Sequence, residues 1–306
     1  MKMTSENFAM GVFLFSQISV GVLGNTSILF YYVTLILNGK HLMPKDLIIE
    51  HLTFANCLNI ISRGIPQTVS YFGLKVFLND IGCKIILYIY RITRGMCLYM
   101  MCLLSCFQAI TISSSNSRWR KLKHRANKYI GPSCSVSWLV HLLLNIMIPS
   151  NVSSLSYTKN TTKRVSYEYC SLLASEKLVT ALYMLLLCFS DGLCLGLMAY
   201  SSVSMMSRLY RHKRQVKNIH GAWRVLKVSP EDRATQTILI LLCTFAISYL
   251  YSSIVTVFRT CSKYPVLWEV NVFTVIEICF PIFSPFVLIT NLKTGTSLFL
   301  PCTSKR

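Results

Sequence analysis

Long apolar stretches, separated by short polar ones, make up most of the chain. Residues 8–38 contain no charged side chain, and about 20 apolar residues are enough to cross a bilayer. That stretch is too long for the core of a signal peptide, so we expect it to be retained as an anchor. The same pattern recurs along the chain, and the predicted spans are residues 8–38, 47–73, 85–112, 129–149, 178–207, 234–258 and 266–291.

These spans leave no room for a separate soluble domain. The pattern therefore predicts an all-α membrane protein, a seven-transmembrane helix bundle that forms one domain over residues 1–306. Composition agrees with this, because only 14% of the residues are charged and mean hydropathy is +0.50. A soluble domain has about a quarter of its residues charged, and a disordered chain is far less apolar.

Basic residues give the bundle a predicted orientation. The chain has 31 lysines and arginines against 11 acidic residues, and most of the basic residues follow spans 1, 3 and 5 or lie in the tail. By the positive-inside rule, the N-terminus is then extracellular and the C-terminus cytoplasmic. This bias accounts for most of the net charge, so no nucleic acid partner is expected. The basic connections could serve topology and attraction to the lipid bilayer, or form a surface for a protein partner.

Glycosylation sequons agree with this orientation. Those that begin at Asn151 and Asn160 follow the fourth span, which the topology places outside. A third begins at Asn25, inside the first span, where glycosylation cannot reach it.

Three cysteines fall on the predicted oxidising side. Cys83 precedes the third span, Cys170 lies in the second outer connection, and Cys261 lies in the third. A bridge between Cys83 and Cys170 would join the third helix to that second connection.

Charged residues inside the spans are candidate functional groups, because a charge at membrane depth is costly and faces the bundle interior. At about 1.5 Å per residue, Arg94 and Glu277 lie at one level, roughly 16 Å from the outer ends of their helices, and Asp191 lies roughly 20 Å deep. We expect Arg94, together with Arg91, to pair with Glu277 and to leave Asp191 for a second pair or a ligand. The alternative is a purely structural ion pair. Arg63 is expected near the outer end of its helix, with its side chain extending outward.

Aromatic residues on the same helices suit an apolar cavity for a small organic ligand, although membrane helices also use aromatics for packing. The predicted ligand-binding residues are Tyr88, Arg91, Arg94, Asp191, Phe273 and Glu277.

Signatures of other functional classes are absent from the sequence. There is no P-loop, no Gly-x-Ser-x-Gly and no zinc-ligand spacing among the cysteines and histidines. The sequence therefore predicts no enzyme, no cofactor and no metal. A transporter or channel stays an alternative, but we see neither a repeat between the halves nor a filter loop.

Four strings, in order along the chain, carry a resemblance to a receptor family. They are LLSCFQAITIS at 103–113, YRHKRQV at 210–216, RATQTI at 233–238 and CFPIFSPFVLI at 279–289. Rhodopsin-like signatures are missing, since the inner end of the third helix has no Asp-Arg-Tyr and the seventh helix has no Asn-Pro-x-x-Tyr. The chain resembles the vomeronasal type-1 receptors over essentially its whole length, with Ser114 standing where that family usually has proline. Bitter taste receptors match less well in the seventh helix.

The resemblance implies a G-protein-coupled chemosensory receptor for pheromones or other small odorants. It also implies a plasma membrane location in vomeronasal sensory neurons and activation of an inhibitory-type heterotrimeric G protein. A bitter-taste-like receptor is the alternative within the receptor class. The residues expected to contact the G protein, at the inner ends of the helices, are Arg118, Arg120, Arg211, Lys213, Arg214 and Arg233.

Overall fold

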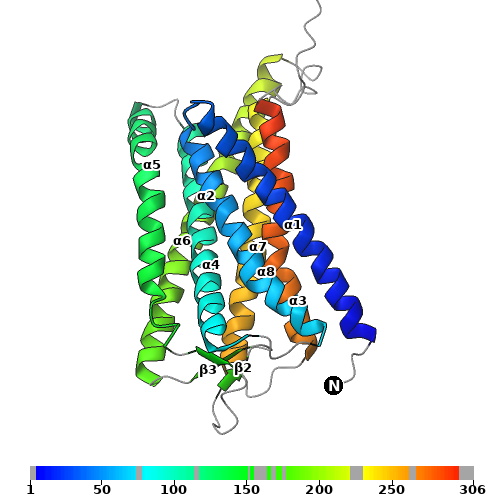
Figure 1. Ribbon diagram of the computed structural model, residues 1–306. Coiled ribbons are helices and arrows are strands. Elements are labelled where there is room, and N and C mark those ends of the chain that lie inside the picture. Colours follow the sequence, from blue (N-terminus) through cyan, green and yellow to red (C-terminus); the bar gives the residue numbers. More distant parts are fainter. Residues whose placement is uncertain are drawn as a thin grey trace, which may run out of the picture.

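Helices form nearly all of the structure. The computed structural model describes residues 5–73, 78–113, 117–150, 152–154, 164–166, 170–173, 177–220, 230–261 and 267–295. The helices are α1 Ser5–Leu37, α2 Pro44–Asn59, α3 Ile65–Tyr71, α4 Asp80–Ile112, α5 Ser117–Leu144, α6 Lys177–His220, α7 Pro230–Cys261 and α8 Leu267–Gly295. A π-helical turn, η1 (Ile60–Gly64), joins α2 to α3. The helices run side by side in one bundle (Figure 1).

Each predicted span overlaps one helical rod, but two of the helices extend much further than predicted. α5 begins at Ser117 rather than at residue 129, and α6 continues to His220 rather than ending at residue 207. Hydropathy detects only the part of a helix that can lie in lipid, whereas lysine and arginine are good helix formers in water. α5 also ends earlier than predicted, at Leu144, and turns follow it up to residue 150.

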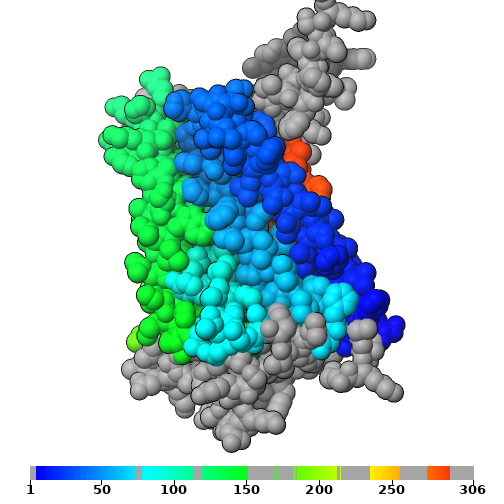
Figure 2. All heavy atoms as spheres, in the orientation of Figure 1, coloured from blue at the N-terminus to red at the C-terminus, as the bar shows by residue number. Residues whose placement is uncertain are grey.

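Four helices in the described part of the chain are long and apolar enough to cross a membrane. The stretches are Ser5–Leu37, Asp80–Ile112, Leu185–Arg211 and Thr235–Val255, and a shorter apolar stretch is Thr274–Ile289. The outer surface of the bundle is apolar, as lipid contact requires. On α1, which runs along one side of the face in Figure 2, Leu23 and Phe30 are 67% and 71% exposed. A continuous apolar surface of this kind is typical of membrane contact.

α4 lies at the centre of the bundle. It packs against α2, α5, α6 and α7, and Met96, Met100 and Met101 on it are fully buried. Long unbranched side chains of this kind fill irregular gaps between helices. α1 approaches α8 closely at Gly21, where an added Cβ would come within 2.8 Å of Ile282. Small residues at such crossings let membrane helices pack against one another.

A small sheet covers one end of the bundle. Its strands are β1 Val152–Ser154, β2 Arg164–Ser166 and β3 Cys170–Leu173, arranged antiparallel in the order β1-β3-β2. We call this end, where α1 also begins (Figure 1), the sheet end. The all-α prediction omitted these strands, because three- and four-residue strands leave no readable period in the sequence.

A disulfide between Cys83 and Cys170 fixes β3 to the first turn of α4, with the two Cα atoms 5.8 Å apart. α4 begins here because Asn79 caps it. The Asn79 side-chain oxygen accepts a hydrogen bond of 2.8 Å from the backbone N–H of Gly82. The central helix and the sheet are thus held together at the sheet end.

Candidate functional site

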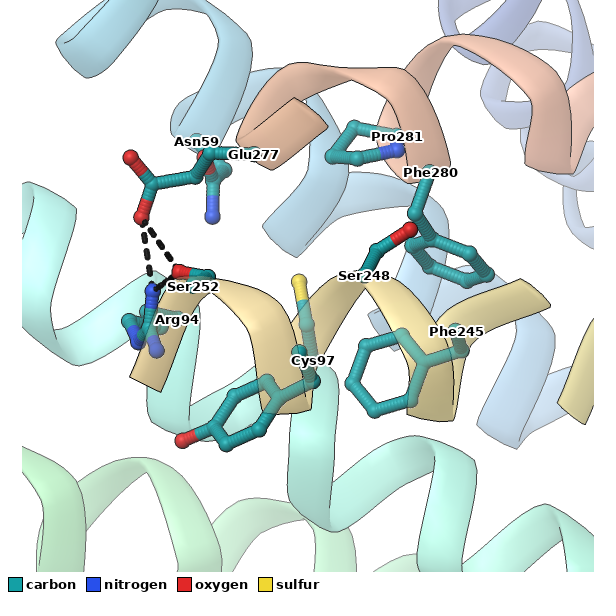
Figure 3. Close-up of a pocket in the computed structure, with 10 residues that line it drawn as sticks. Asn59, Arg94, Cys97, Phe245, Ser248, Ser252, Glu277, Phe280 and Pro281 are labelled. Atoms are coloured by element: carbon teal, nitrogen blue, oxygen red, sulfur yellow. Dashed lines mark hydrogen bonds and ion pairs between the residues drawn. The ribbon is translucent and has the colours of Figure 1, made fainter. Parts of the chain in front are cut away.

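Glu277 on α8 is the centre of a buried polar network. Its Oε1 accepts hydrogen bonds from Arg94 Nη1 at 2.6 Å and from Ser252 Oγ at 3.3 Å (Figure 3), and also from the Tyr90 hydroxyl. Its Oε2 accepts from Arg63 Nε at 3.1 Å. Two guanidinium groups therefore share one carboxylate inside the bundle. We call Arg63, Tyr90, Arg94, Ser252, Thr274 and Glu277 the Glu277 network.

Arg63 is part of this network, which corrects the sequence expectation. We expected its side chain near the outer end of the helix and extending outward, but it is only 1% exposed and forms an ion pair with Glu277. Its Nη2 also donates to Thr274 Oγ1 at 3.4 Å. Arg63 lies in the π turn η1, and π turns are frequent at functional sites. Gly73, the last residue of the predicted span, lies ten residues beyond Arg63, which corresponds to a depth of about 15 Å in the membrane. This count along the sequence could have placed Arg63 at the level of Arg94 and Glu277.

Arg94 extends the network toward α6 and α7. It donates to Ser252, and its Nη2 donates to Ser253 Oγ at 3.1 Å. Its guanidinium carbon lies 4.6 Å from the centre of the Tyr249 ring, a cation–π distance. The Tyr249 hydroxyl in turn donates to Asp191 Oδ2 at 2.7 Å.

The formal charges of this assembly cancel. Arg63 and Arg94 carry two positive charges, and Glu277 and Asp191 carry two negative ones. Cancellation matters here because an unbalanced charge is costly in a low-dielectric interior. The Glu277 network joins η1, α4, α7 and α8, and Tyr249 connects it to Asp191 on α6.

A cavity of about 30 Å³ adjoins the network. Figure 3 shows the side chains that surround it, which are Asn59, Arg94, Cys97, Phe245, Ser248, Tyr249, Ser252, Glu277, Phe280 and Pro281. Pockets for drug-sized ligands measure roughly 300–1,000 Å³. In this arrangement the bundle side chains fill the centre themselves, and a larger ligand would require them to separate.

The other predicted ligand-binding residues lie apart from the cavity. Tyr88 donates to the backbone oxygen of Leu142 at 2.8 Å, so it joins α4 to α5. Arg91 is half-buried on α4 and Asp191 is half-buried on α6, and neither lines the cavity. Phe273 lies in α8, and its side chain is outside the described part of the chain. Their ligand-binding role stays a prediction.

A second polar cluster joins α1, α2 and α8, and the sequence analysis missed it. Asn25 Nδ2 donates to the backbone oxygens of Gly21 and Pro281, each at 2.8 Å. Asn56 Nδ2 donates to Ser284 Oγ at 2.9 Å. Asn25 and Asn56 are fully buried. Asparagines inside apolar spans are the signal that could have located this cluster.

The remaining predicted residues are those of the sequons and of the expected G-protein contacts. The sequon residues Asn151 and Asn160 lie outside the described residues. At the end opposite the sheet, Arg120 on α5 and Arg211 and Arg214 on α6 are exposed. Three further predicted G-protein contacts lie in helices, with side chains outside the described part, namely Arg118, Lys213 and Arg233. Within the described residues, no cluster of histidine, cysteine, aspartate or glutamate could hold a metal ion.

Comparison with known proteins identifies the family. The profile of the vomeronasal organ pheromone receptor family matches residues 8–299. Human vomeronasal type-1 receptor 3 is 44% identical over 290 residues, which cover 94% of this chain and 93% of that receptor. Human vomeronasal type-1 receptor 4 is 42% identical over 288 residues, covering 94% and 95%. Rat vomeronasal type-1 receptor 94 is 30% identical over 283 residues, covering 91% and 85%.

These matches extend over almost the whole chain and over nearly the full length of the relatives. They confirm the resemblance seen in the four sequence strings, and they assign the chain to receptors rather than to enzymes. They show that the chain belongs to the vomeronasal type-1 receptor family.

Proposed function

We propose that the protein is a chemosensory receptor of the plasma membrane, of the kind expected in vomeronasal sensory neurons. It binds a small organic ligand, a pheromone or odorant, within the helix bundle and activates an inhibitory-type heterotrimeric G protein. Its chain crosses the membrane seven times, with the N-terminus outside and the C-terminus in the cytoplasm. The name of the family supports the ligand class, since it describes pheromone receptors.

The arrangement of the two ends supports this orientation. The start of α1, the sheet and the Cys83–Cys170 disulfide lie together at the sheet end (Figure 1). Disulfides persist on the oxidising, extracellular side of a membrane. The exposed arginines Arg120, Arg211 and Arg214 lie at the other end, as the positive-inside rule requires for a cytoplasmic face.

The Glu277 network is the observation that carries the proposal. Ionisable residues inside a membrane bundle are costly and mark functional sites, and here they connect η1, α4, α7 and α8. A ligand that separates or bridges these groups acts on all four elements at once. A ligand that binds one arrangement of the helices better than another shifts the equilibrium between them.

Two further features suit transmission of that shift. α6 continues past the apolar stretch to His220, so a tilt of α6 displaces its exposed basic end by a larger distance. α8 contains Pro281 and Pro285, each of which removes one backbone hydrogen bond and allows a bend. Pro281 also lines the cavity. We infer that the ligand acts on α6 and α8 and that the basic ends of α5 and α6 contact the G protein.

Filling the cavity tests the ligand site. Ser248 lines the cavity on α7, whereas Thr244, one turn earlier, is exposed on the outer surface. We expect Ser248→Met to abolish the calcium response of cells that co-express the receptor with a promiscuous G protein, when volatile and steroid-like compounds are applied. Thr244→Met adds a comparable side chain toward lipid and should leave the response unchanged. Equal responses of the two surface-expressed variants would exclude the cavity as the ligand site.

Coupling is tested separately. Replacing Arg211, Lys213 and Arg214 together by glutamine should reduce the response at unchanged surface expression. In cells that contain only inhibitory-type G proteins, the toxin that ADP-ribosylates their α subunit should abolish the response. A response that survives the toxin would contradict the inhibitory subtype, and an unchanged triple variant would mean that these charges serve topology alone.

A further inference from the structure

Asn59 at the end of α2 has a side-chain amide oxygen without a hydrogen-bond partner among the described residues. Asn59 is only 5% exposed. Among the described residues, its Oδ1 is buried and has no hydrogen-bond partner. An unpartnered buried polar group costs about 1–3 kcal/mol, so native structures rarely retain one without an unseen partner.

The space beside Asn59 is the cavity already described, and its size matches a single oxygen. The cavity measures about 30 Å³, and a water molecule needs about 10–15 Å³ together with two to four polar partners. Its lining residues include Asn59, Ser248 and Ser252, which are polar and neutral, and Cys97, Phe245 and Phe280, which are apolar. Figure 3 shows these side chains around the same space.

The charge balance determines what the cavity can bind. Both oxygens of Glu277 already accept hydrogen bonds, and Arg63 and Arg94 are both paired with it. A charged ligand would therefore have to break an existing ion pair. The Asn59 amide instead carries an acceptor oxygen and a donor NH2 group. A neutral group that both donates and accepts fits this pair, and a hydroxyl oxygen does both.

We propose that the Asn59 amide and this cavity form a binding site for one neutral hydroxyl oxygen. Water supplies that oxygen in the empty receptor, and the hydroxyl of an apolar ligand replaces it when a ligand binds. The water part stands on the structure alone, whereas the ligand part rests on the proposed function. The site favours neutral alcohols over carboxylic acids, amines, ethers and hydrocarbons of similar size.

Thermal unfolding of the purified receptor tests the site without any signalling assay. Asn59→Leu replaces the amide by an apolar group of similar shape. If the amide holds an oxygen, this change removes real hydrogen bonds, and the apparent Tm should fall by about 3 °C or more. If the amide is unpartnered, the same change removes a buried polar group, and the Tm should stay equal or rise. An equal or higher Tm would overturn the proposal.

Two isomeric probes separate the sources of the oxygen. 1-Octanol and heptyl methyl ether have the same formula, but only the alcohol donates a hydrogen bond. If the ligand hydroxyl enters, 1-octanol should give the wild type a higher Tm than the ether does, by about 2 °C, and Asn59→Leu should remove this difference. Equal effects of the two probes, together with a lower Tm for Asn59→Leu, would support the site with water as its occupant and exclude the alcohol.

A direct measurement covers the case in which Asn59→Leu does not fold. An experimental structure of the wild-type receptor that resolves ordered water should show density about 2.7–3.2 Å from the Asn59 amide. An empty cavity at that resolution would overturn the proposal. Because none of these measurements uses a G protein, loss of signalling in cells would count against the proposed function and not against this site.

Discussion

Two arginine-rich regions of this receptor differ in almost every physical respect. In the Glu277 network, Arg63 is 1% exposed and Arg94 has a side chain that is 14% exposed, and both pair with one carboxylate. At the start of α5, Arg120 and Arg125 are exposed, and neither forms an ion pair with another described residue. Removal of one partner of a buried pair is costly, whereas exposed charges contribute little to stability. Arginine therefore connects helices through ion pairs in the Glu277 network, whereas at the start of α5 it forms part of the exposed surface.

The largest effect should come from removal of the shared carboxylate. Glu277→Gln leaves the Arg63 and Arg94 guanidinium groups buried without a counter-charge, so we expect a loss of about 3–5 kcal/mol in the free energy of unfolding. Scanning calorimetry or a thermofluor assay on purified receptor measures it. Glu6→Gln is the matched control, because Glu6 is exposed at the start of α1. Comparable Tm values for the two variants would show that the Glu277 network contributes nothing to stability.

Loss of a single arginine should cost less, because Glu277 keeps the other one. For Arg63→Met or Arg94→Met we expect a destabilisation of about 1.5–3 kcal/mol, the range for a hydrogen bond to a charged group. Apparent Tm measures this as well, with Arg214→Met as the exposed control. If either variant is as unstable as Glu277→Gln, then Glu277 does not share its charge between two partners.

The sequence predicted part of the Glu277 network. Depth counted along the helices placed Arg94 and Glu277 at one level, and the structure brings them together. The same count could have included Arg63, but position along a helix does not give rotation about it. The π turn at Ile60–Gly64 changes that rotation, and a turn of this kind leaves no sequence pattern to read. Arg63 was therefore expected at the surface and is found in the centre.

For the exposed basic region at the start of α5, the sequence predicted the charge but not the helical structure. Basic residues after the third span set the predicted orientation, yet they lie in the first turns of α5 and not in a loop. Hydropathy cannot distinguish a solvated helix from a solvated loop, because both are polar. Asn59 could not be predicted either, because an unpartnered amide is a property of the packed bundle. Sequence reasoning therefore identifies the charged residues, their depth and the pair of Arg94 with Glu277, but not the pair that Arg63 forms with Glu277.

A smaller effect is expected where the network reaches α6. Tyr249→Phe removes the hydroxyl that donates to Asp191 but keeps the ring beneath Arg94. We expect a loss of about 1 kcal/mol, seen as a small decrease in apparent Tm. Tyr200→Phe on exposed α6 surface provides the control, since Tyr200 is 71% exposed. A loss as large as that of the arginine variants would mean that Asp191 belongs to the core of the network.

The smallest effect should come from the exposed region, and it isolates surface charge from buried charge. Neutralisation of Arg120, Lys121 and Arg125 to glutamine should change the free energy of unfolding by no more than about 0.5 kcal/mol, because these side chains are exposed. Any change should also disappear in about 1 M salt, where the Debye length falls to about 3 Å. The Glu277→Gln loss should persist at that salt concentration, because buried pairs are screened much less. A Glu277→Gln effect that salt abolishes would place the network in contact with solvent, and the two regions would then differ only in geometry.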